Sequence, residues 1–174
     1  MLSQAGARFK IGRRSFPAKW VGRPLAVSDW EFVGRLKDAT DMCVVVKGIV
    51  TWEDSERCVQ HGADGVIVSN HGGRAEESGR ATIESLPEVV EGVAGRVPVL
   101  VDSGFRRGND IVKALALGAT AICVGRPYLW GLAAFGQPGV ERVLDILRAE
   151  LILAMKLAGR PSLADLDRTL VVGV

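Results

Sequence analysis

Short apolar runs alternate with amphipathic stretches from about residue 28 to the end of the chain. The apolar runs predict buried strands at residues 42–46, 65–68, 98–101 and 121–124. Helical periodicity predicts helices at residues 30–38, 53–61, 83–93, 110–117 and 140–158. Continuously apolar strands that are separated by helices are typical of a parallel sheet with covered faces, so the pattern predicts an α/β fold.

The joints between these elements share the same turn chemistry. Gly62 and Gly118 each stand shortly before a predicted strand, where glycine commonly ends the preceding helix. The segments 61–72 and 117–127 are also weakly similar to each other, which indicates repeated βα units. Repetition of this kind favours a βα barrel over an open doubly wound sheet.

Chemically useful residues follow every predicted strand at its carboxyl end. In βα barrels these strand ends converge on one rim, and active sites lie on that rim. We therefore expect the residues concerned to form one site. In chain order they are Lys47, Ser69, His71, Asp102, Gly125 and Arg126.

The segment 69–74 reads Ser-Asn-His-Gly-Gly-Arg and directly follows an apolar strand. His71 is a base that works near neutral pH, and Arg74 offers a planar fork that suits a carboxylate. The two glycines between them let the backbone bend, so that both side chains can face one small substrate. The segment predicts a general base and a carboxylate anchor.

The other strand ends offer groups for a larger ligand. Lys47 would stabilise a developing anion, although a lysine at a strand end can also simply extend to solvent. Asp102 would accept hydrogen bonds from polyol hydroxyls and Arg106 would contact phosphate, unless the two form an ordinary surface ion pair. Backbone N–H groups at Gly125, together with Arg126, would cradle a phosphate.

Composition narrows the class of protein. The 174 residues fit one domain, and a formal charge of +2 gives no argument for a nucleic-acid partner. No apolar run approaches the ~18 residues needed to span a membrane. Cys43, Cys58 and Cys123 form no CxxC pair, which predicts reduced thiols, no metal site and a cytoplasmic protein.

Residues 1–23 hold six basic residues and no acidic ones. This charge pattern predicts that residues 1–28 form a basic leader or a remnant loop, and that residues 29–174 form the domain. A transit peptide is the alternative for the basic stretch.

Five motifs occur in order between about residue 30 and residue 166: Val-Lys-Gly-Ile, Ser-Asn-His-Gly-Gly-Arg, Asp-Ser-Gly-Phe-Arg-Arg-Gly, Lys-Ala-Leu-Ala-Leu-Gly-Ala and Gly-Arg-Pro-Tyr-Leu-Trp-Gly-Leu-Ala. This series resembles the FMN-dependent 2-hydroxy-acid oxidases and dehydrogenases, which include glycolate oxidase, lactate oxidase, L-lactate dehydrogenase and mandelate dehydrogenase. The resemblance implies a TIM (β/α)8 barrel. This chain resembles only the last four βα units, which make a half-barrel.

The resemblance also implies an activity. FMN would be the cofactor, and an (S)-2-hydroxy acid such as L-lactate would be oxidised to the 2-oxo acid. His71 would be the base, Arg74 would bind the substrate carboxylate, and Lys47 would lie by the flavin N1 edge. Oxygen, a quinone or another carrier would reoxidise the flavin. The implied FMN-binding residues are Lys47, Ser69, Asp102, Ser103, Gly104, Phe105, Arg106, Gly125 and Arg126.

The sequence departs from the family pattern in three ways. Ser103 replaces a glycine that is usual in the family, and Ala75-Glu76-Glu77 follows Arg74 where Gln-Leu-Asp is typical. The third departure is the missing half of the barrel. A half-barrel leaves open strand edges and an apolar inner face, so we expect a homo-oligomer or a complementary half-barrel as partner.

Two alternatives stay open at this point. The chain can be a truncated, catalytically silent half-barrel that binds FMN or phosphate. It can also be another phosphate-binding barrel, related to isopentenyl-diphosphate isomerase or inosine-monophosphate dehydrogenase. Those barrels share the glycine-rich phosphate end but not the His-Gly-Gly-Arg segment.

Overall fold

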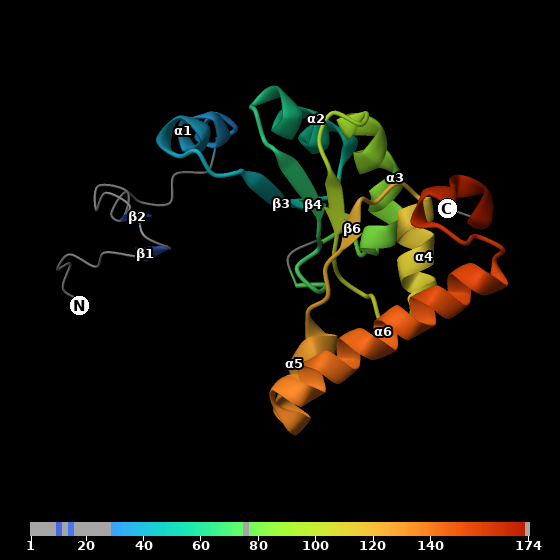
Figure 1. Cartoon of the computed structure of the whole chain (residues 1–174). Coiled ribbons are helices and arrows are strands. Elements are labelled where there is room, and N and C mark those ends of the chain that lie inside the picture. The colour runs from blue at the N-terminus through green and yellow to red at the C-terminus, as the bar shows by residue number, and fades with distance from the viewer. Residues whose placement is uncertain (1–9, 12–13, 16–28, 75–76, 173–174) are drawn as a thin grey trace.

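The structure is a computed structural model, and it describes residues 10–11, 14–15, 29–74 and 77–172. Its centre is a parallel four-stranded sheet in the order β3-β4-β5-β6 (Figure 1). The strand order follows the chain order, so a helix-containing crossover leads from each strand to its neighbour. The predicted α/β fold is confirmed. The strands are β3 (Val45–Ile49), β4 (Gly65–Val68), β5 (Val99–Val101) and β6 (Ala121–Ile122).

Helices lie before, between and after these strands. A short antiparallel pair, β1 (Lys10–Ile11) with β2 (Arg14–Ser15), precedes them in the chain. The predicted leader or loop at residues 1–28 otherwise falls outside the described residues. The helices are α1 (Glu31–Ala39), α2 (Trp52–Gln60), α3 (Thr82–Val93), α4 (Gly108–Ala116), α5 (Arg126–Phe135) and α6 (Gln137–Leu157), with 3-10 turns η2 (Leu163–Asp165) and η3 (Arg168–Leu170).

Side chains cap the helices that connect the strands. The Thr51 hydroxyl accepts the backbone N–H of Asp54 at 3.3 Å and so begins α2. The Glu84 carboxylate accepts the N–H of Ala81 at 2.6 Å at the start of α3. Asp110 in α4 accepts the N–H groups of Arg106 and Arg107, both at 2.9 Å. The last cap fixes the loop that leaves the end of β5.

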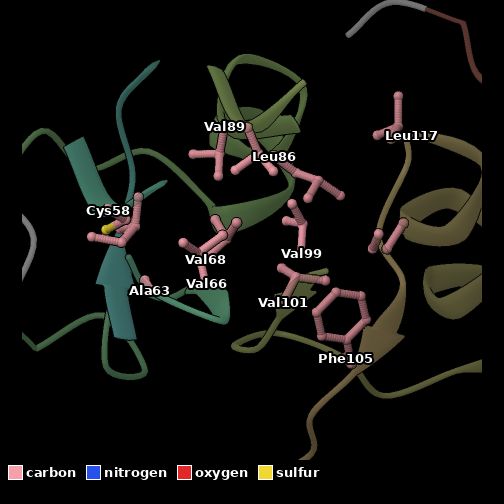
Figure 2. Packing of buried hydrophobic residues seen from close by; sticks show 14 of the residues in the cluster. Cys58, Ala63, Val66, Val68, Leu86, Val89, Val99, Val101, Phe105 and Leu117 are labelled. Carbon is pink, nitrogen blue, oxygen red and sulfur yellow. The ribbon is translucent and has the colours of Figure 1, made fainter. Parts of the chain in front are cut away.

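One face of the sheet carries the core. Val66 pairs with Val99 and Val68 with Val101, and all four side chains are buried. They pack with Leu86 and other side chains from the covering helices (Figure 2). Since alternate residues of a strand point to opposite faces, the intervening residues face the other way. Lys47, Ile67, Leu100 and Ala121 are paired in one row across that second face, and none of them is fully buried.

The predicted boundaries of β3 are wrong by three residues. The strand begins at Val45, so Lys47 lies within it and not after its end, and Val45 is 45% exposed. The prediction of a strand buried on both faces is therefore also wrong, because only one face of β3 meets helices. A β-bulge separates Lys47 from Ile49, and Gly48 occupies it with a φ of 101°.

Helix α5 was not predicted, because residues 126–135 contain Pro127 and Gly131, which indicate a turn. Pro127 lies in the first turn of the helix, where a missing N–H costs nothing. Gly131 faces Gly139 of α6 so closely that a side chain on either would overlap the backbone of the other. Within the described ranges, no helix has both the length and the apolar composition needed to cross a membrane.

Candidate active site

A cleft of about 490 Å³ opens at the carboxyl ends of the four strands. Every residue predicted for the site lines it except Ser69, so the expected convergence of strand ends takes place. The predicted residues in its wall are Lys47, His71, Arg74, Asp102, Ser103, Gly104, Phe105, Arg106, Gly125 and Arg126.

Ser69 directly follows β4 and binds both Lys47 of β3 and the His71 turn. It is only 1% exposed. Its hydroxyl accepts a hydrogen bond from Lys47 Nζ at 2.7 Å and another from the backbone N–H of His71 at 3.1 Å. Lys47 Nζ also lies 3.0 Å from Asp102 Oδ2. Ser69 and Asp102 therefore orient the Lys47 ammonium together.

Asp102 is held in its ionised form. Burial by itself would raise the pKa of this carboxyl group, but hydrogen bonds from Ser69, Ser103 and Lys47, together with the charge of Lys47, lower the pKa below its ordinary value. The cleft consequently presents a fixed carboxylate, which accepts hydrogen bonds from hydroxyl groups.

His71 begins a turn with unusual backbone conformation. The φ angles of His71, Gly72 and Gly73 are 55°, 75° and 81°, all in the left-handed region that glycine tolerates best. Asn70 closes the turn, because its side-chain oxygen accepts the N–H of Gly73 at 2.9 Å. A non-glycine residue in this region costs roughly 1–3 kcal/mol, and such strain concentrates at functional sites.

Two contacts place the functional side chains of this turn. The His71 ring lies against the bulge in β3, where a Cβ on Gly48 would come within 3.1 Å of the ring carbon Cε1. Arg74 Nε donates to the carbonyl oxygen of His71 at 3.0 Å. The imidazole and the guanidinium are therefore presented from one short segment, as the motif predicted.

Two more arginines, Arg106 and Arg126, line the cleft. Arg106 Nη1 donates to the carbonyl oxygen of Phe105 at 2.8 Å, and its guanidinium lies 5.0 Å from the centre of the Trp130 ring. Gly125 caps the first turn of α5, and a Cβ added there would meet no atom within 4 Å. Although Phe105 lines the cleft, the residue is only 4% exposed and belongs to the core (Figure 2).

The sequence reasoning missed Cys123, which also lines the cleft. Its position follows from strand register: Leu100 pairs with Ala121, and Asp102 and Cys123 each lie two residues further on. Burial, followed by the charge of Asp102, raises the pKa of the Cys123 thiol, and the charge of Lys47 opposes this. The thiol is therefore protonated at neutral pH. No cluster of metal-ligating side chains occurs in the part of the chain that the structure describes.

The cleft wall thus presents two chemically different groups of side chains. One group is a lysine, a carboxylate, a histidine and an arginine, and the other is two arginines beside the start of a helix. This donor set fits a long ligand with hydroxyl groups in its middle and a phosphate at one end, as FMN has. Fold and site together define a flavin-binding type of βα-barrel unit.

The comparisons with known proteins give the family. Residues 7–173 match the sequence model of the FMN-dependent dehydrogenases. The chain is 47% identical to mouse 2-hydroxyacid oxidase 1 over 162 residues, which cover 92% of this chain and 44% of that protein. It is 46% identical to spinach glycolate oxidase over 158 residues, which cover 91% of this chain and 42% of that protein. The chain belongs to the FMN-dependent dehydrogenase family, and the predicted resemblance is confirmed.

Solved structures agree with the fold. A Pediococcus acidilactici protein described as a lactate oxidase matches with a TM-score of 0.78 at 44% identity, over 80% of this chain and 39% of the other. A mandelate oxidase variant that carries an FMN adduct matches with a TM-score of 0.77 at 48% identity, over 81% of this chain and 45% of the other. The predicted half of a TIM barrel is confirmed. The chain spans less than half the length of the curated relatives described above.

Proposed function

We propose that this chain carries the FMN-binding and proton-transfer half of an enzyme that oxidises (S)-2-hydroxy acids, such as L-lactate, to 2-oxo acids. One observation carries the proposal. The turn with His71 and Arg74 and the bonded pair Lys47–Asp102 line the same cleft. The relatives are named for 2-hydroxy acids, glycolate, lactate and mandelate, which supports this substrate class.

Arg74 and His71 would handle the substrate. The Arg74 guanidinium would bind the substrate carboxylate through paired hydrogen bonds. An imidazole nitrogen of His71 would accept a proton from the substrate. The bond from Arg74 to the His71 carbonyl supports this division of roles, because it keeps the anchor and the base on one turn.

FMN would occupy the length of the cleft and, when bound, supply the two-electron acceptor. Lys47 would lie by the edge of the ring, with Ser69 acting on the flavin through Lys47. Asp102 would accept hydrogen bonds from the ribityl hydroxyls, with Ser103, Gly104 and Phe105 forming the adjoining wall. Arg106, Arg126 and the N–H groups at Gly125 would bind the phosphate.

The partner and the location are also proposals. The uncovered sheet face around Val45, together with exposed apolar residues on α5 and α6 such as Phe135 and Leu157, supports a complementary half-barrel or a second copy as partner. We propose the cytoplasm as the location, although an Arabidopsis relative is named peroxisomal.

A catalytically silent FMN-binding half-barrel is the second candidate. The observation in its favour is the share of the relatives that this chain covers, which is below one half. It predicts FMN binding without oxidation of any 2-hydroxy acid.

Anaerobic titration distinguishes the two candidates. The full chain is titrated with FMN by fluorescence and then with L-lactate, glycolate or mandelate while the flavin absorbance is followed. We expect binding and then bleaching, and His71→Asn should slow the bleaching by about 10²–10⁴-fold while FMN stays bound. Arg142→Gln on α6, away from the cleft, is the matched control.

Absence of FMN binding would overturn both candidates. Binding without bleaching by any of the three acids would identify the silent half-barrel for this chain alone. A second sample, mixed with the part of mouse 2-hydroxyacid oxidase 1 that precedes the matched region, asks whether a complementary half restores bleaching.

A further inference from the structure

The peptide groups on either side of Gly72 are both tied to other strand ends. The N–H of Gly72 donates to Ser103 Oγ at 3.1 Å. Its carbonyl oxygen accepts a hydrogen bond from Arg126 Nη2 at 3.3 Å. The residue directly after the proposed base is thus held from the end of β5 on one side and from the start of α5 on the other.

The Ser103 hydroxyl has both of its hydrogen-bonding roles occupied. It accepts from Gly72, and it donates its one proton to Asp102 Oδ1 at 2.7 Å. A hydroxyl committed in this way joins the His71 turn to the carboxylate that Lys47 also contacts. It cannot at the same time donate to a ligand in the cleft.

The backbone of Ser103 is unfavourable for a side chain. Its φ is 71°, in the left-handed region where glycine would be accommodated with less strain. Compared with a glycine, a serine here adds backbone strain. It also adds the two hydrogen bonds of its hydroxyl, to Gly72 and to Asp102, which a glycine could not make.

We propose that Ser103 is a positioning residue. Its hydroxyl fixes the His71 turn because it accepts from the Gly72 N–H and donates to the Asp102 carboxylate. The inference rests on the proposed function only for its purpose, the placement of His71 as a base. The hydrogen-bonded link from Gly72 through Ser103 to Asp102, which we call the clamp, is present in the chain without cofactor. Arg126 binds the carbonyl oxygen of the same residue, so both peptide groups of Gly72 are anchored.

Hydrogen exchange of the Gly72 amide, measured by NMR on the full chain without FMN, tests the clamp. Ser103→Gly and Ser103→Ala both remove the hydroxyl, and we expect Gly72 to exchange about tenfold faster in each, as loss of one hydrogen bond implies. Ser103→Thr keeps the hydroxyl and should keep Gly72 protected. The Val44 amide, which donates to Asp64 at 2.6 Å just before the start of β3, is the internal control.

The same three variants separate positioning from general stability. Ser103→Gly relieves backbone strain and Ser103→Thr increases it, because a β-branched side chain is least tolerated at this φ. Urea unfolding should therefore rank Thr as less stable than Gly, whereas Gly72 protection should rank them in the opposite order. Protection that follows global stability across all three variants, or that is unchanged in Ser103→Gly, overturns the proposal.

Titration of the wild-type chain with FMN tests the proposed function independently of the clamp. Failure to bind FMN, with Gly72 released in Ser103→Gly and Ser103→Ala but protected in Ser103→Thr, would overturn the function and still support the clamp. FMN binding without any change at Gly72 in the variants would overturn the clamp and support the function.

Discussion

The two faces of the central sheet are built from the same strands and are stabilised in different ways. On the helix-covered face, Val66, Val68 and Val101 have no exposed surface and pack with many neighbours. On the cleft side, Lys47 and Asp102 are held by a few directional bonds at 2.7–3.0 Å. Apolar packing sums over many small contacts, whereas each polar bond fixes the position of one group. The comparison predicts that substitutions on the helix-covered face affect mainly stability and that those on the cleft side affect mainly ligand binding.

The largest effect is expected from the helix-covered face. Leu86 on α3 is fully buried, and Leu86→Ala should lower the free energy of unfolding by about 2–5 kcal/mol, since it leaves a cavity in a packed core. Urea unfolding measures this. Leu153→Ala, at a position 56% exposed on α6, is the matched control and should change little. Loss of FMN affinity in Leu86→Ala while it remains folded would break the comparison.

On the cleft side, a smaller loss of folding stability is expected as pH falls. The pKa of Asp102 is lower in the folded protein than the ~3.9 of a free aspartate, so its ionised form contributes stability above that value. The contribution is lost as pH falls through the folded pKa. Urea midpoints should therefore decline below about pH 4, and Asp102→Asn should flatten part of that decline.

Asp64 provides the matched control for the pH prediction. Hydrogen bonds from Lys37 and from the Val44 N–H lower the pKa of its carboxyl group as well, but it lies just before β4 and away from the cleft. Asp64→Asn should also flatten the decline and should leave FMN affinity unchanged. Asp102→Asn should weaken FMN binding. Equal effects of the two variants on FMN would contradict the separation of stability from binding.

The smallest effect is expected at the proposed phosphate site. The Arg106 guanidinium lies 5.0 Å from the centre of the Trp130 ring, and Trp130 is 57% exposed. A cation–π contact at such a site contributes about 0.5–1 kcal/mol. Trp130→Leu should therefore weaken FMN binding about two- to fivefold by fluorescence titration, while Trp130→Phe should keep most of the affinity. An unchanged dissociation constant in Trp130→Leu would show that the ring does not position Arg106.

The sequence predicted the strand β4 to the residue, because its apolar run is bounded on both sides by polar or turn residues. It misplaced β3, since the run 42–46 carries no sign of which residue pairs first, and the register with Gly65 decides this. It missed α5, because Pro127 and Gly131 are of residue types that are common in turns. Their actual roles depend on the start of the helix and on α6, which lie outside any local pattern.

The candidate site was predicted in outline but not in its internal bonds. The motifs indicated which strand ends converge, and the cleft contains them. The sequence did not reveal that Ser69 would be buried and bonded to Lys47, nor that Ser103 would bond to Gly72, because both depend on side-chain direction and on neighbouring loops. Register alone would have indicated Cys123.

The bulge at Gly48 has a consequence for insertions and deletions. It shifts the phase of β3, so that Lys47 pairs with Ile67 on the cleft side whereas Ile49, two residues later, pairs with Val68 on the helix-covered side. Ile49 is consequently 5% exposed and joins the core, although an unbroken strand would point it the same way as Lys47. The one extra residue reverses the alternation of side chains along the strand. Lys47, before it, therefore faces the cleft side, and Ile49, after it, faces the core. Deleting it would force one of these two side chains onto the opposite face.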